Sequence, residues 1–175
     1  AIYSFVFSSV FQSKWPHYSG NSITSFACIL FVGLLIHTFY VEALSRSSMV
    51  IQEHPNYVKK IVFPLELLPL IAVASAGFRA VVSLLVLVMV LVFSQGFVHW
   101  SSLAIILVLI ALTFHTVGLC LFVAALGVFV KDLSHFIGIL GILLLFVSPI
   151  FYPLSSLPID LGWVVYLNPL TFAIE

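Results

Sequence analysis

Few residues of this sequence could take part in chemistry, and most of them lie inside apolar segments. Arg79 is the only charged residue between Glu66 and Lys131, and a charge at the centre of a membrane costs about 3 kcal/mol. Ser75, Arg79 and Ser83 recur every fourth residue, which places them on one face of a helix. This polar face could line a substrate pathway and bind an anionic pyrophosphate or sugar acid. Alternatively, Arg79 could bond to backbone carbonyl groups of a neighbouring helix.

Two histidines and two cysteines also lie in apolar segments. His37 and His115 could relay protons, although single intramembrane histidines more often form hydrogen bonds between helices. Cys28 and Cys120 are far apart in the sequence and have no clustered metal ligands, so we expect reduced thiols and no metal site. The sequence contains no evident nucleophile with a neighbouring base, and therefore no catalytic residue is predicted.

The sequence also lacks a nucleotide-binding loop of its own. None of its lysines stands in the frame G-x-x-x-x-G-K-[ST], in which backbone amides and the lysine bind the phosphates. We therefore expect no cofactor in this chain. If ATP drives the protein, then a partner chain binds the ATP and the magnesium.

The composition identifies the environment in which these residues act. Of the 175 residues, 63% are hydrophobic and only 7% are charged, whereas soluble domains contain about 25% charged residues. Six basic and six acidic residues give zero net charge, so there is no basic surface for nucleic acid. The composition predicts an integral membrane protein.

Long continuous apolar runs predict helices, because lipid offers no partner to unpaired backbone groups and barrel strands are short and alternating. The predicted fold is all-α, a polytopic transmembrane bundle that forms one domain over residues 1–175. The expected spans are approximately 1–11, 23–44, 66–93, 101–130 and 135–152, with a loop at 45–65 and a proline-rich tail at 153–175. Because the first span is incomplete, we expect the sequence to be a piece of a longer chain.

The distribution of basic residues predicts the orientation in the membrane. The loop 45–65 and the turn 131–134 share one side, which holds four basic residues, whereas Lys14 is alone on the other side. The loop 45–65 is therefore expected in the cytoplasm. Its first part, 45–54, is predicted to form a separate short helix that Ser45 caps and Pro55 ends. That helix could dock on a soluble partner or rest on lipid headgroups.

Several motifs occur in an order that resembles one family. The motifs are Glu42 with Asn56-Tyr-Val-Lys-Lys-Ile-Val-Phe-Pro-Leu-Glu-Leu-Leu-Pro-Leu70, Asp132-Leu133, Ser148-Pro-Ile-Phe-Tyr-Pro153, Leu157-Pro158 and Leu167-Asn-Pro-Leu170. They resemble the permease subunits of ABC transporters that export O-antigen, capsular polysaccharide or teichoic acid. The resemblance covers nearly the whole chain. Lys131 stands where the family usually has an arginine, which keeps the charge and loses the bidentate fork.

The resemblance implies an assembly of several chains. A subunit would have six spans, five of which are represented here. It would pair with a second copy of itself and with two cytoplasmic ATPase subunits, in the cytoplasmic (inner) membrane of a bacterium. The substrate would be a lipid-linked glycan, with O-antigen on a polyprenyl-pyrophosphate carrier as the expected case. The residues expected to couple to the ATPase are Arg46, Glu53, Asn56, Lys59, Lys60, Lys131 and Asp132.

The tail at 153–175 would form an outer gate of re-entrant or interfacial helices. Tyr152, Trp163 and Tyr166 could stack on sugar rings in such a gate. They could equally form the aromatic belt that membrane proteins have at the water boundary. Both interpretations fit the sequence.

Two other classes of function stay open. An ion-coupled secondary transporter would need ionisable residues at mid-membrane, whereas Glu42 and Glu66 are expected near the cytoplasmic edge. An intramembrane lipid-modifying enzyme could use His37 or His115, but neither has a visible partner in the sequence. Both alternatives are therefore disfavoured against the exporter.

Overall fold

The computed structural model describes residues 23–55, 64–95, 104–150 and 168–174, and every regular element within these ranges is a helix. The helices are α2 (Ile23–Glu53), α4 (Leu67–Gln95), α5 (Ala104–Phe129), α6 (Leu133–Val147) and α8 (Thr171–Ile174). The prediction of an all-α fold is thus confirmed. The remnant of the first span at 1–11 lies outside the described residues.

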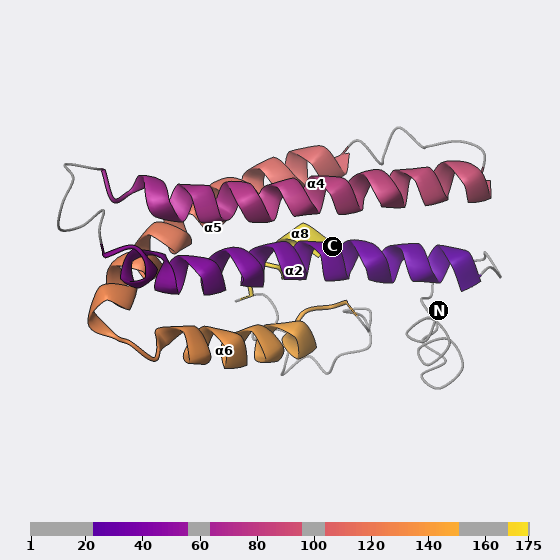
Figure 1. Cartoon of the computed structure of the whole chain (residues 1–175). Coiled ribbons are helices and arrows are strands. Elements are labelled where there is room, and N and C mark those ends of the chain that lie inside the picture. Colours follow the sequence, from indigo (N-terminus) through magenta and orange to yellow (C-terminus); the bar gives the residue numbers. More distant parts are fainter. Residues whose placement is uncertain (1–22, 56–63, 96–103, 151–167, 175) are drawn as a thin grey trace.

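Helix α2 is the centre of the bundle. It contacts α4, α5, α6 and the short α8, and α4 and α6 lie on opposite sides of it (Figure 1). α2 and α4 run side by side in opposite directions. This arrangement allows α2 to bury side chains around most of its circumference, where a surface helix would bury one stripe.

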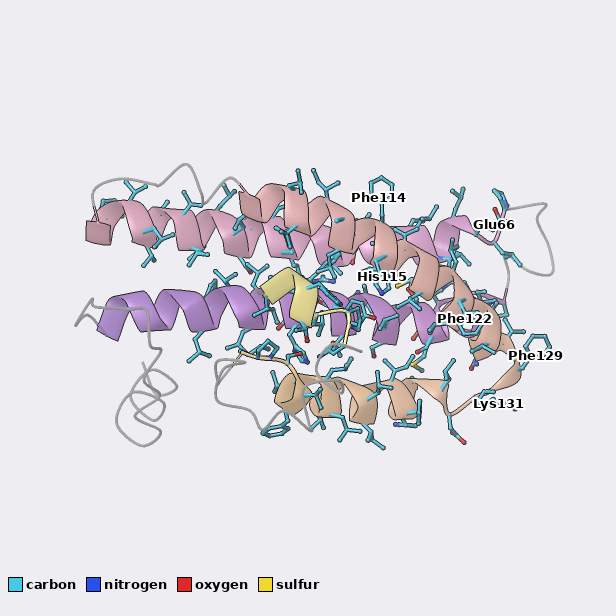
Figure 2. All side chains as sticks on the ribbon, turned by 180° about the vertical axis from the view of Figure 1, so that it is seen from behind. Glu66, Phe114, His115, Phe122, Phe129 and Lys131 are labelled. Carbon is cyan, nitrogen blue, oxygen red and sulfur yellow. The ribbon has the colours of Figure 1, made fainter. Side chains whose placement is uncertain are left out.

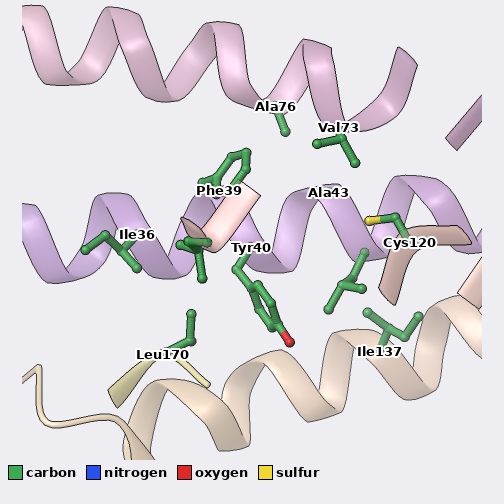
Figure 3. Close-up of a cluster of buried hydrophobic side chains, with 11 residues drawn as sticks. Ile36, Phe39, Tyr40, Ala43, Val73, Ala76, Cys120, Ile137 and Leu170 are labelled. Carbon is green, nitrogen blue, oxygen red and sulfur yellow. The ribbon is translucent and has the colours of Figure 1, made fainter. Parts of the chain in front are cut away.

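A cluster of buried hydrophobic side chains joins α2, α4, α5, α6 and the residue that precedes α8 (Figure 3). α2 contributes Ile36, Phe39, Tyr40, Ala43 and Leu44, and the other members are Val73, Ala76, Leu112, Cys120, Ile137 and, just before α8, Leu170. Ala72 and Ala76 of α4 are 7% and 1% exposed, and small residues at such positions allow helices to approach closely.

α2 is one uninterrupted helix of 31 residues that ends at Glu53. The prediction of a separate helix at 45–54 with Ser45 as its cap is therefore wrong. No glycine or proline stands between Leu44 and Glu53 to break the helix, and the carbonyl of Ser45 accepts a hydrogen bond from the hydroxyl of Ser48 at 2.7 Å. The predicted stop is correct, because Pro55 disfavours helical backbone in the residue before it.

Helix α6 is shorter than the span predicted at 135–152. It ends at Val147, and Ser148 has extended backbone with ψ 142°. The physical cause is Pro149, which pushes the preceding residue out of the helical region. The helix also starts earlier than predicted, at Leu133.

The outer faces of the bundle are apolar. The stretches Leu67–Phe93 and Leu107–Phe129 are long and apolar enough to cross a membrane, and only 11% and 22% of the residues in an apolar 18-residue window of each are buried. Phe114 of α5 is 76% exposed and points away from the bundle (Figure 2). A core helix of a soluble protein would be mostly buried, so these faces fit lipid as their surroundings.

Candidate functional site

Three charged side chains meet between α2 and α4, and we refer to Glu42, Arg46 and Arg79 as the charged cluster. Arg79 binds the carboxylate of Glu42 through two nitrogens, with Nη2 at 2.6 Å from Oε1 and Nε at 3.1 Å from Oε2. Arg46 donates from Nε to Oε1 of the same carboxylate at 3.1 Å. Nη2 of Arg79 also donates to the hydroxyl of Ser75 at 3.0 Å. One carboxylate therefore serves two guanidinium groups.

The antiparallel packing of α2 and α4 explains why these residues meet. Glu42 precedes the end of α2 at Glu53, and Arg79 follows the start of α4 at Leu67, by nearly equal numbers of residues. At 1.5 Å per residue both positions lie roughly 17 Å from the same end of the bundle. Arg46 stands four residues after Glu42, which is the spacing of neighbours on a helix surface.

A groove adjoins the charged cluster between the same two helices. Its volume is about 270 Å³, and it is open on one side. Glu42, Arg79 and Ser83 supply polar groups, and Phe31 and Leu34 belong to its mainly apolar lining. A second hollow includes Arg46 and shares Thr38 and Glu42 with the groove. The carboxylate of Glu42 thus belongs to both hollows.

The three residues predicted for a substrate pathway occupy neighbouring positions here. Arg79 and Ser83 line the groove, and Ser75 fixes the guanidinium of Arg79. Arg79 bonds to a carboxylate. The alternative prediction, in which Arg79 bonds to backbone carbonyl groups of a neighbouring helix, named a different partner. The sequence reasoning missed Glu42 as its partner, because it placed Glu42 at the membrane edge.

At one end of the bundle α2 and α5 meet closely. The side-chain amide of Gln52 donates to the carbonyl of Gly127, and a side chain at Gly127 would collide with the backbone oxygen of Ser48. Glu66, Phe129 and Lys131 lie at this same end (Figure 2). We refer to the part of this end formed by residues 48–53 and 127–132 as the elbow.

The predicted coupling residues divide between three places. Glu53, Lys131 and Asp132 are exposed at the elbow. Arg46 is exposed as well, but its guanidinium belongs to the charged cluster. Asn56, Lys59 and Lys60 lie outside the described residues.

Comparison with known proteins identifies the family. The sequence profile of the ABC-2 type transporters matches residues 1–175. The chain belongs to this family.

Curated relatives of this ABC-2 type transporter chain include O-antigen export system permease proteins RfbA. One from Klebsiella pneumoniae is 29% identical over 172 residues, which are 97% of this chain and 62% of that protein. One from Myxococcus xanthus is 30% identical over 141 residues, which are 78% of this chain and 53% of that protein. The chain thus spans between half and two thirds of the length of these relatives.

Two motifs of this ABC-2 type transporter chain meet in space although they are 20 residues apart. The side-chain amide of Asn168 donates to the hydroxyl of Ser148 at 2.7 Å, and its oxygen accepts from the backbone N–H of Leu170 at 3.0 Å. Asn168, Ser148 and Leu170 are 3%, 0% and 0% exposed. The gate residues Tyr152, Trp163 and Tyr166, which lie between the two motifs, fall outside the described residues.

His37 and His115 each contact a neighbouring helix. Nε2 of His37 lies 2.9 Å from the carbonyl oxygen of Gly141 in α6. The ring of His115 in α5 stacks on Tyr40 of α2 with ring centres 6.2 Å apart. These contacts support bridging roles, and within the described residues no three histidine, cysteine or acidic side chains group as metal ligands.

Proposed function

We propose that this chain is the membrane subunit of an ABC exporter that moves lipid-linked polysaccharide, with O-antigen on a polyprenyl-pyrophosphate carrier as the substrate. The observation that supports this most is the similarity to a curated O-antigen export permease over 97% of the chain. A glycan on a lipid carrier has an apolar chain, an anionic link and a long polar part. Its passage requires a route between helices and no covalent chemistry.

The motor in this proposal is a separate pair of ATPase subunits in the cytoplasm, which bind the ATP and magnesium. The permease acts as a dimer of six-span subunits in the bacterial inner membrane. Glu53, Lys131 and Asp132 at the elbow, together with Arg46, Asn56, Lys59 and Lys60, are the residues assigned to ATPase contact. The continuous α2 supports this assignment, because a rigid helix can transmit displacement of its cytoplasmic end to the bundle core.

The substrate pathway in this proposal follows the polar face of α4. Arg79 and Ser83 line the groove, Ser75 holds the guanidinium of Arg79, and Arg79 bears the charge that would meet the anionic link. Tyr152, Trp163 and Tyr166 form the outer gate, where aromatic rings can stack on sugars. These roles are assigned from the groove geometry and from the resemblance of the motifs.

Reversing charges at the elbow tests the proposal in the complete transporter. We expect the double variant Glu53→Lys, Lys131→Glu to lose co-purification with the ATPase and to export about tenfold less glycan. Lys14→Glu, on the predicted outer side, is the matched control and should leave both unchanged. Transport driven by a proton gradient without ATP would refute the exporter and favour an ion-coupled carrier.

A further inference from the structure

The charged cluster has a surplus of positive charge. Arg46 and Arg79 share the single carboxylate of Glu42, and no other acidic side chain among the described residues lines either hollow. The cluster therefore has one net positive charge. Arg79 stands near the middle of the candidate span Leu67–Phe93, where an uncompensated cation is costly.

Both arginines also keep hydrogen-bond donors available. Within the described residues, Arg79 uses Nε and Nη2, and Arg46 uses only Nε. Nη1 of Arg79 and both terminal nitrogens of Arg46 have no partner there. The side chains of Arg79 and Arg46 are 46% and 53% exposed. A planar guanidinium with free terminal nitrogens matches the oxygens of a phosphate group.

The lining and the volume of the groove indicate what chemical group adjoins the phosphate in the ligand. Phe31, Leu34 and Leu35 of α2 and Ala80 of α4 give it an apolar lining next to Arg79. The volume of about 270 Å³ is slightly smaller than that of typical small-molecule sites, which start near ~300 Å³. This space suits an anionic headgroup with the start of an apolar chain and is too small for a glycan.

We propose that the groove between α2 and α4 binds the phosphate or pyrophosphate group of a long-chain lipid, with Arg79 as the ligand inside the groove. Arg46, which lines the adjoining hollow and contacts the same Glu42 oxygen as Arg79, is the second ligand. The identification of this lipid as the carrier of the exported glycan rests on the proposed function. Glu42 is the competing anion of the site. It holds Arg79 through one hydrogen bond and one ion-pair contact when the groove is empty, and the incoming phosphate displaces it.

This role of Glu42 gives the site an unusual signature. Replacing Glu42 by glutamine removes the internal competitor but keeps a side chain of the same shape. The affinity for the anionic lipid should then rise, whereas loss of a purely structural ion pair would lower it or leave it unchanged. One charge-assisted hydrogen bond corresponds to roughly a tenfold change in affinity.

Equilibrium binding of radiolabelled farnesyl pyrophosphate to the purified complete permease tests the site. We expect Arg79→Gln to bind this probe about tenfold more weakly and Glu42→Gln about tenfold more tightly. Glu66→Gln makes the same chemical change outside the groove and should leave the affinity as it is. Farnesol and inorganic pyrophosphate, which each provide half of the probe, should both compete poorly.

Three results would overturn the proposal. They are equal affinity in the native protein, Arg79→Gln and Glu42→Gln, full competition by farnesol, or competition by phosphatidylglycerol as strong as by the probe itself. The last result would assign the groove to an ordinary membrane phospholipid. If Arg79→Gln fails to fold, Glu42→Gln and the neutral pair Glu42→Gln, Arg79→Gln still decide the matter.

ATP-dependent glycan export, measured on the same preparations, separates this inference from the proposed function. Export without probe binding refutes the groove site alone. Probe binding without any ATP-dependent export refutes the exporter. This chain would then be a membrane protein of another function that has a phosphate-lipid site.

Discussion

Asn168 and Ser148 show how much a few buried polar atoms can determine. The amide of Asn168 closes the extended turn after α6 and holds the start of α8 through Leu170. Neither side chain can reach water for a replacement hydrogen bond, because both are buried. A buried polar group that loses its partner costs about 1–3 kcal/mol.

We therefore predict that Asn168→Ala destabilises the complete permease by about 2 kcal/mol, since it leaves the Ser148 hydroxyl and the Leu170 N–H unpaired. Thermal unfolding of the purified protein measures the effect. Thr113→Ala is the control, because the Thr113 hydroxyl donates to the carbonyl of Leu109 in its own helix. Ser148→Ala should add little to Asn168→Ala, and independent, additive losses would show that the two side chains do not act as one pair.

The sequence predicted the position of Arg79 better than its partner. The spacing of Ser75, Arg79 and Ser83 was sufficient to place a polar face on one helix, because that pattern is local. The ion pair joins residues 37 positions apart. It depends on which helices pack together and on their relative position along the bundle axis. A single sequence contains no direct signal for that packing.

Among the helices, α2 departs most from expectation. Charged residues after Leu44 suggested a membrane boundary and a new helix, but polarity does not end a helix when no glycine or proline intervenes. The helices α4 and α5 coincide with apolar runs of the sequence, because these runs are long and continuous. The ends were predicted poorly because capping and prolines determine them over one or two residues.

The crossing of α2 and α5 offers a test with two glycines of one helix. Gly127→Ala places a methyl group against the Ser48 carbonyl, and the backbone there cannot yield without separating the helices. We expect a loss of about 1–3 kcal/mol in stability, as in other overpacked contacts, together with weaker coupling of ATP hydrolysis to export.

Gly118→Ala is the matched control for this crossing. A Cβ atom at Gly118 would meet nothing within 4 Å, so the better helix propensity of alanine should make the change neutral or stabilising by about 0.5–1 kcal/mol. Thermal unfolding and ATP-dependent export, measured on both variants, give the comparison. Equal behaviour of the two variants would mean that the close approach of α2 to α5 is unimportant.

At the scale of the whole bundle, the exposed apolar faces and the distribution of charge predict one orientation of the protein in the membrane. The elbow gathers exposed charged groups such as Glu53, Lys131 and Asp132, whereas Phe93 near the opposite end of α4 is 86% exposed and apolar. An end with basic residues in its loops faces the cytoplasm in most membrane proteins. A cytoplasmic ATPase can reach the elbow only if the elbow faces the cytoplasm.

Cysteine accessibility measures this orientation directly. In a chain with Cys28 and Cys120 replaced by alanine, we expect Glu53→Cys and Lys131→Cys to react with a membrane-impermeant maleimide only in inverted vesicles. Phe93→Cys, nearer the other membrane surface, should react only in intact spheroplasts. Labelling of Glu53→Cys from outside the cell would place the elbow out of reach of any cytoplasmic ATPase. The exporter would then be untenable, whereas the phosphate-lipid groove would still stand, because its position is near the middle of the span from either side.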